Sequence, residues 1–407
     1  MNSILAHRID RVVAWSILWL VLALSCVVGL LTPYIVGVTG IGILLVVLLR
    51  RQWAEAYGGL AARLFLGAFL ALGICFAVTA QEPRDVVSTF NFTGLLLFGP
   101  FVLLLSRQTS GNMLTVTRLA ALGAALAFLL AIVARYGLGY ERADTPLAGA
   151  ILLGNTAVLL GFLAVPGVLL HPDARRRWLY LLPPLCGVAA VAITASRGPM
   201  LSIAPLVVLC AVVITRQLRI RPFVAVVGTI AYLALCVAIL FGLNDRLLTL
   251  FGIAGEMGTG VAVSDTNASI RLAFYEAGFR AFLDAPIFGH GWARMMTAVA
   301  PYLTEEMREF LWLPHLHNDI IDFAVAAGMV GVAIYLLILF APLIAAWRSP
   351  RDVLYPHRLF AVAILVVAYA FDGLTDLMFG MEYHTMLFVV LSAILLGWCR
   401  ERRSAFR

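Results

Sequence analysis

Long apolar runs separated by short polar connections make up almost the whole chain. The runs are about fifteen to twenty-odd residues long, close to the ~20 residues that an α-helix needs to cross a bilayer. We count about twelve predicted spans, at residues 12–31, 34–49, 60–79, 92–105, 114–133, 147–170, 178–194, 200–214, 223–243, 319–347, 357–374 and 386–398. The pattern therefore predicts an all-α polytopic integral membrane protein.

The spans are interrupted once by a long polar segment. Residues 1–243 hold the first nine spans, residues 244–317 form the segment, and residues 318–407 hold the last three. Within the segment, "TNASIRLAFYEAGFRAFLDAPIFGHGW" opens with an Asn/Ser cap and stops at Pro286 and Gly289, so it predicts a helix. We therefore expect one membrane domain with one large, partly helical loop.

The arginines predict the orientation in the membrane. The chain has no lysine, and cytoplasmic termini would put 20 of its 29 basic residues on the cytoplasmic side. This bias agrees with the positive-inside rule. We expect both termini in the cytoplasm and the long segment outside.

Composition excludes several functional classes. Only 13% of the residues are charged, about half the share in a soluble protein. The net charge of +7 is scattered over short connections, which does not indicate a nucleic-acid surface. The six cysteines show no C-x-x-C spacing and predict neither a disulfide framework nor a metal site. The first apolar run is too long for a cleaved signal peptide.

Two histidines in the motif P-H-L-H-N-D directly precede the tenth span. His317 would lie at a helix N-terminus, whose positive end disfavours the imidazolium and keeps a neutral base available. His315 is a supporting neighbour. A structural alternative stays open, because Asn318 can cap the span, and Asp319 and Asp322 suit the first turn of a helix. The functional hypothesis is that His317 is a general base.

Several arginines lie on the predicted outer side, where the topology rule does not require them. Arg197 occupies a tight turn, and Arg271 lies in the first turn of the loop helix, where a positive charge opposes the helix dipole. An anion site would explain the position of Arg271, whereas Arg197 is also compatible with an interfacial arginine at the end of a span. Arg280 is nine residues further on, nearly opposite on the helix, and Arg84 lies in the short loop "QEPRD". Both are supporting candidates.

Acidic residues and metal motifs give a weaker signal. Asp372 and Asp376, in "FDGLTDLMFG", are the best acidic candidates to orient a site residue, although a cap at the end of a span is equally compatible. Two histidines at i and i+2 are a weak metal signal, so no metal or other cofactor is expected. The spans carry almost no ionisable group at mid-depth, which disfavours a transporter.

Two stretches resemble a known family. "RLAFYEAGFRAFLDAPIFGHGWARM" followed by "HLHNDIIDFAVAAGMVGVAIYLLIL" is similar to the signature region of the O-antigen ligase/polymerase superfamily. The shared pattern is an arginine, an amphipathic helix, a D-x-P-x-x-G-x-G turn, and H-N before a Gly-x-x-Gly membrane helix. With the short-loop arginine the likeness spans about residues 195–335. The layout of spans resembles the ligase (WaaL) branch.

The resemblance implies a GT-C-type membrane glycosyltransferase. Such ligases transfer polysaccharide from undecaprenyl pyrophosphate to lipid A–core oligosaccharide at the periplasmic face of the bacterial inner membrane, without a metal. The essential residues of the family correspond to Arg197, Arg271 and His317, with an acidic residue at the position of Asp372 as a supporting candidate. Alternatives are an O-antigen polymerase, with a lipid-linked glycan as acceptor, a protein O-oligosaccharyltransferase and, from another class, a lipid or solute transporter.

Overall fold

The computed structural model describes residues 2–108, 112–244 and 265–399, and it contains no β-strand within these ranges. The predicted outer segment 244–317 is thus described only at Asn244 and from residue 265 on, and the predicted cytoplasmic residues 400–407 lie outside the description. The main helices are α1 (Asn2–Leu18), α3 (Thr32–Leu49), α5 (Leu60–Thr79), α7 (Thr93–Ser106), α8 (Met113–Ile132), α9 (Ala150–Ala164), α11 (Leu182–Thr194), α12 (Met200–Leu218), α13 (Pro222–Leu243), α15 (Thr266–Asp284), α18 (Asp319–Trp347), α19 (Tyr355–Asp372) and α20 (Glu382–Ala393).

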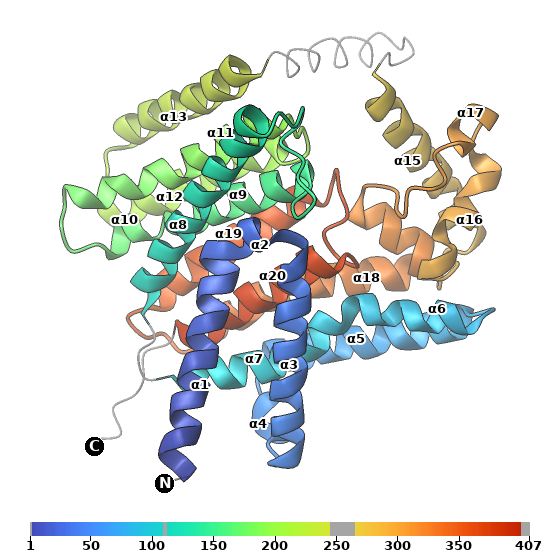
Figure 1. Cartoon of the computed structure of the whole chain (residues 1–407), viewed down its shortest axis with the longest axis horizontal. Helices are drawn as coiled ribbons and strands as arrows, with labels where there is room; N and C mark the ends of the chain where they lie inside the picture. The colour runs from blue at the N-terminus through green and yellow to red at the C-terminus, as the bar shows by residue number, and fades with distance from the viewer. Residues whose placement is uncertain (1, 109–111, 245–264, 400–407) are drawn as a thin grey trace.

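Ten helices in the described part of the chain are long and apolar enough to cross a membrane. The first two predicted spans fall in one helical run, Arg8–Leu49. This run reverses direction near Gly29, which has a φ of +57°, so that α1 and α3 run in opposite directions (Figure 1). The last predicted span falls in the shorter apolar helix Glu382–Trp398. The all-α, multi-pass class is therefore confirmed, and the count of twelve crossings stays a prediction.

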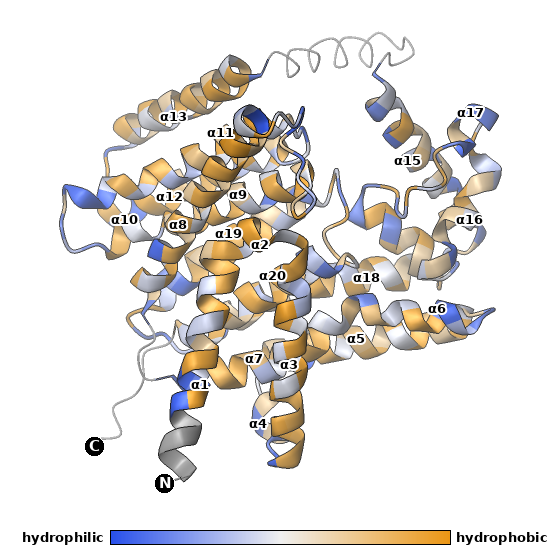
Figure 2. Cartoon of the chain, viewed as in Figure 1, coloured by the Kyte–Doolittle hydropathy of each residue, from blue (hydrophilic) through white to orange (hydrophobic). Residues whose placement is uncertain are grey.

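The transmembrane core is centred on α9. Almost every residue of α9 is buried, and α8, α11 and α19 pack around it. A second group is formed by α18 with α5 and α19. Apolar residues dominate the long helices, whereas polar residues gather near the short helices α6 (Pro83–Val87) and α17 (Glu305–Arg308) (Figure 2).

Residues 265–318 form a cap beside α18 with its own apolar cluster. The cluster consists of Ile270, Phe274, Ala277, Ala281, Met295, Val299, Leu303, Leu316 and Val325. The first four of these come from one face of α15, as the sequence pattern predicted for an amphipathic helix. Because Leu316 packs into this cluster, it fixes the positions of His315 and His317 on either side of it.

A break in α18 is filled by the turn that follows α15. Ala327 and Gly328 depart from helical geometry, and the backbone N–H groups of Met329 and Val330 donate to the carbonyls of Pro286 (2.8 Å) and Ile287 (3.3 Å). A Cβ on Gly328 would lie 2.3 Å from the Ile287 backbone, so only glycine fits there. The D-x-P-x-x-G-x-G turn thus supplies the hydrogen bonds that the broken helix lacks.

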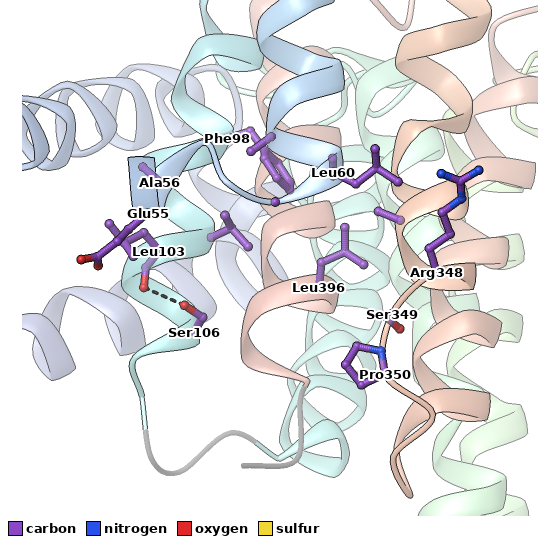
Figure 3. Close-up of a pocket in the computed structure, with 15 residues that line it drawn as sticks. Glu55, Ala56, Leu60, Phe98, Leu103, Ser106, Arg348, Ser349, Pro350 and Leu396 are labelled. Atoms are coloured by element: carbon purple, nitrogen blue, oxygen red, sulfur yellow. Dashed lines mark hydrogen bonds between the residues drawn. The ribbon is translucent and has the colours of Figure 1, made fainter. Parts of the chain in front are cut away.

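The C-terminal end of α18 and the N-terminal end of α19 are joined by a buried arginine. Arg358 is 0% exposed and donates to the Ser349 hydroxyl and to both carboxylate oxygens of Asp352, 3.2 Å away. It also donates to the Cys399 carbonyl, 2.9 Å away. A cavity of about 260 Å³ lies at this end of the molecule. Figure 3 shows that Leu60, at the start of α5, and Arg348, just after α18, both line it.

Candidate active site

The backbone of the H-L-H-N motif is wrapped around one carboxylate. Asp322, in the first turn of α18, accepts the N–H of Leu316 at Oδ1 (2.8 Å) and that of Asn318 at Oδ2 (3.4 Å). The N–H of His317 donates to Nδ1 of His315 (3.2 Å). Three successive N–H groups are thereby bound within the loop, and His317 takes a left-handed φ of +60°. Such a backbone costs about 1–2 kcal/mol in a non-glycine residue, and these hydrogen bonds maintain it.

Asn318 and Asp319 attach α18 to the connection between α19 and α20, residues 373–381. Asn318 caps α18, because its side-chain oxygen accepts from the N–H groups of the second and third helical residues, and its amide donates to the Leu374 carbonyl (3.0 Å). Asp319 is buried and accepts from the N–H groups of Met378 and Phe379 at 2.8 and 3.2 Å. Both residues thus make structural contacts at the start of α18, and these contacts place the 373–381 connection against the histidines.

This connection brings a carboxylate beside the candidate base. Oδ1 of Asp376 lies 3.5 Å from Nδ1 of His317, within ion-pair distance, although Nδ1 has no regular hydrogen-bond partner among the described residues. Burial would raise the pKa of Asp376, but the interaction with His317 and the nearby imidazoles of His384 and His315 outweigh it and lower the pKa. With Nδ1 directed at a carboxylate, Nε2 of neutral His317 carries the free lone pair.

His315 is a neutral neighbour of this pair. Its ring lies edge to face with that of His317, with centroids 4.2 Å apart. Burial, together with the neighbouring His317 and Arg271, lowers the pKa of His315 to about 4, and Asp376 only partly opposes this effect. Because Nδ1 accepts the His317 N–H, the neutral ring carries its proton on Nε2. His315 can therefore donate a hydrogen bond but does not compete as a base at neutral pH.

Tyr275 connects α15 to the same loop. Its hydroxyl donates to the carbonyl of His317 (2.9 Å) and lies 3.3 Å from that of Leu374. Burial raises the pKa of Tyr275, against the lowering effect of Arg271 one turn earlier on the helix. Arg271 is partly buried and forms no ion pair with a described residue. Its guanidinium is thus available to an anion next to the histidines.

Arg197 reaches this region from the turn between α11 and α12. Its guanidinium lies 2.9 Å from the carboxylate of Asp265, which also caps α15 by accepting the N–H of Ala268. The adjacent Gly198 packs against Thr375, since a Cβ added there would lie 2.8 Å from the Thr375 hydroxyl. Arg197 is therefore connected to α15 on one side and to the Asp376 connection on the other.

The remaining candidates lie apart from the histidines. Arg280 is exposed and pairs with Glu276 at 2.6 Å, on the outer face of α15. Arg84 is exposed beside Glu82 at the start of α6. Asp372 is buried next to Ser202 of α12. The carboxylate beside His317 thus belongs to Asp376.

The histidine cluster has a geometry that could hold a metal ion. Ligand atoms of His315, His317 and Asp376 lie within 4.8 Å of one another. A metal on His315 would, however, have to displace either the Nε2 proton or the hydrogen bond at Nδ1.

Sequence reasoning missed Tyr275, Asp265 and His384. Tyr275 stands four residues after Arg271, and this spacing puts both on one face of a helix. Asp265 directly precedes the predicted cap of that helix and has the residue type of an N-cap. Nothing in the sequence indicates that His384, which is fully buried in α20, is close enough to influence Asp376.

Comparison with known protein families identifies one match. Residues 182–336 match a family described as O-antigen ligase. The matched stretch runs from α11 into α18 and includes Arg197, Arg271 and His317, whereas Asp376 lies beyond it. No curated protein matches the chain.

Proposed function

Residues 182–336 match the O-antigen ligase family, and from this match we propose that the protein is an O-antigen ligase of the GT-C type. It transfers polysaccharide from undecaprenyl pyrophosphate to a sugar hydroxyl of lipid A–core oligosaccharide. The observation that carries the proposal is the arrangement of two arginines around one loop: Arg271 lies one turn from Tyr275, whose hydroxyl holds His317, and Arg197 pairs with the cap of the same helix.

The arginines bind the leaving group. Departure of the polyprenyl pyrophosphate builds negative charge on its oxygens, and guanidinium groups neutralise that charge through charge-assisted, partly bidentate hydrogen bonds. The positive charges of Arg197 and Arg271 do the work that a divalent ion does in many other glycosyltransferases. The reaction is therefore metal-independent.

His317 activates the acceptor. Nε2 takes the proton of the acceptor hydroxyl while the oxygen attacks the anomeric carbon of the donor sugar. The new C–O bond forms as the bond from that carbon to the pyrophosphate oxygen breaks, and the electron pair leaves with the pyrophosphate. Asp376 stabilises the imidazolium that results, at 3.5 Å from Nδ1. One displacement with one base inverts the configuration at the anomeric carbon.

The site faces the periplasm in the proposed topology. Both termini are cytoplasmic, and the chain crosses the inner membrane twelve times. Ten of the crossings correspond to the candidate spans if Arg8–Leu49 is counted once. The reversal near Gly29 makes that run into two, and Glu382–Trp398 is the last.

A reconstituted reaction tests the function. Purified protein receives lipid-linked glycan and lipid A–core, with no other component. A higher-mass lipopolysaccharide is expected. Longer lipid-linked chains without lipopolysaccharide would identify a polymerase instead, and no transfer to either acceptor would overturn the proposal.

A further inference from the structure

One face of α15 carries an exposed apolar stripe. Leu272, Phe279 and Leu283 are 38%, 59% and 57% exposed, and they fall within an arc of about 40° on the helix. The stripe continues past the end of the helix in Ile287 and Phe288, which are 56% and 48% exposed. These five residues, called the α15 stripe below, lie opposite the face that packs into the cap cluster.

Polar residues of α15 are confined to its edges. Glu276 and Arg280 form an exposed ion pair along one edge, and Arg271 and Tyr275 follow the other edge toward the histidines. The helix thus has two apolar faces. One is covered by protein, and the other, the α15 stripe, is exposed. A large exposed apolar surface of this kind marks an interaction site.

The lengths of two membrane-spanning helices place the end of the α15 stripe at the membrane boundary. The first is α18, whose 29 residues span about 44 Å, longer than the ~30 Å hydrocarbon core of a bilayer. About twenty residues counted back from Trp347 reach Gly328, the break that Ile287 fills. The hydrocarbon-spanning part of α18 therefore starts where the turn after α15 is attached.

The second helix is α5, which has the 20 residues needed to cross the bilayer. Leu60 and Arg348 line the same cavity (Figure 3), so the start of α5 is level with the end of α18. Near its other end, the sulfur of Cys75 lies 3.8 Å from the carbonyl oxygen of Phe288. Cys75 is four residues, about 6 Å, before the last residue of α5. The length of α5 therefore places the turn after α15 near the membrane boundary, as the length of α18 does.

The surface next to the α15 stripe faces lipid. Ile74 and Val78, on either side of Cys75 along α5, are both 66% exposed, and a span exposes such residues to acyl chains. Because Phe288 contacts Cys75, the stripe continues this lipid-facing surface beyond the span. Figure 2 shows apolar residues along α5 and in bands on α15.

From this geometry we propose that α15 is an interfacial helix whose stripe contacts the outer leaflet of the bilayer. The binding partner of the α15 stripe is the lipid surface itself. Amphipathic helices of this kind lie with the apolar face about 5–10 Å into the boundary between headgroups and acyl chains. The segment between the ninth and tenth predicted spans is then partly seated in lipid and does not project wholly into water.

A consequence for the donor rests on the proposed function. Arg271 is the neighbour of Leu272, so a helix lying on the membrane holds its guanidinium at headgroup level. The pyrophosphate of a lipid-linked donor travels at that level. The α15 stripe would let the donor reach the arginine without leaving the bilayer.

Spin-label accessibility tests the lipid contact directly. Phe279→Cys and Leu283→Cys carry a nitroxide in a background with the native cysteines replaced by alanine, in nanodiscs, and Arg280→Cys on the charged edge is the matched control. The ratio of accessibility to oxygen over a water-soluble nickel complex is expected to be several-fold higher at 279 and 283 than at 280. If either variant misfolds, Leu272→Cys and Ile287→Cys repeat the comparison.

Two outcomes would overturn the proposal. Labels at 279 and 283 that are as accessible to nickel as the label at 280 would place the stripe in water. Labels shielded from both reagents would place it against protein, such as a second copy of the chain. The measurement requires no transferase activity, so it stays informative even if the proposed function fails.

Discussion

The Nδ1 atom of His317 lies 3.5 Å from Oδ1 of Asp376, although 59 positions separate the two residues in the chain. The carboxylate orients the imidazole and stabilises its protonated form. We expect Asp376→Asn to lower kcat by roughly 10–100-fold, the range found when the hydrogen-bonding partner of a metal-bound histidine is removed, with KM for the donor nearly unchanged. Asp376→Glu should recover part of kcat. A change in KM alone would show that Asp376 does not act through His317.

His317→Ala should lower transfer by about 10²–10⁴-fold, the usual contribution of a general base, while binding of the lipid-linked donor is retained. Steady-state transfer and donor binding are measured on the same preparation. His171→Ala is the matched control, since His171 lies on the connection between α10 (Gly167–Leu170) and α11, at the opposite end of α11 from Arg197. Transfer at the normal rate by His317→Ala would eliminate the catalytic assignment.

The arginines should not tolerate lysine. Arg271→Lys keeps the charge but loses the planar fork that holds two phosphate oxygens, so kcat/KM should fall by at least tenfold. Arg280→Lys on the same helix should stay within about twofold, because Arg280 is exposed and its pair with Glu276 contributes little. Equal effects of the two substitutions would refute a specific role for Arg271. Arg197→Lys should behave like Arg271→Lys.

Activity should survive excess EDTA, because arginines neutralise the leaving group. The measurement is the initial rate before and after dialysis against the chelator. A loss that magnesium or manganese restores would contradict metal independence. It would identify Asp376 with the two neighbouring histidines, which lie within 4.8 Å of one another, as the metal ligands to test first.

His315 should make the folded state sensitive to mild acid. Its pKa is about 4 in the folded protein and about 6.5 when unfolded, so between these values only the unfolded chain binds the proton. Stability is complete above pH 6.5 and falls toward pH 4, by at most about 3 kcal/mol at about 1.4 kcal/mol per unit. His315→Asn, with an oxygen in place of Nδ1, should lose less stability between pH 7 and 5. Thermal unfolding in detergent at the two pH values measures the difference.

Arg358→Met should destabilise the protein by about 3 kcal/mol, because it removes a fully buried guanidinium that donates to Asp352, Ser349 and the Cys399 carbonyl. Arg351→Met is the control, since Arg351 only stacks on Tyr355 at 5.0 Å and should cost about 1 kcal/mol or less. Thermal unfolding compares both variants with the parent chain. Equal losses would show that the buried network does not hold the ends of α18 and α19.

The sequence by itself determined the elements of this protein. Apolar runs near the length of a bilayer crossing can only form helices there, because lipid offers the backbone no hydrogen bonds. The cap at Asn318, and the opposite faces of Arg271 and Arg280, also follow from local geometry. Local rules suffice for these features because each involves residues within a few positions of one another.

Only the tertiary structure decided which of these residues meet. The family resemblance favours Asp372 over Asp376. In the structure, the N–H groups of Met378 and Phe379 donate to Asp319 and turn the connection so that Asp376 faces His317. The break in α18 was equally hidden, because Gly328 reads as an ordinary small residue of a membrane helix until the turn at Pro286 supplies its hydrogen bonds. Contacts between residues this far apart depend on how whole helices pack, and no periodicity within a single span records that arrangement.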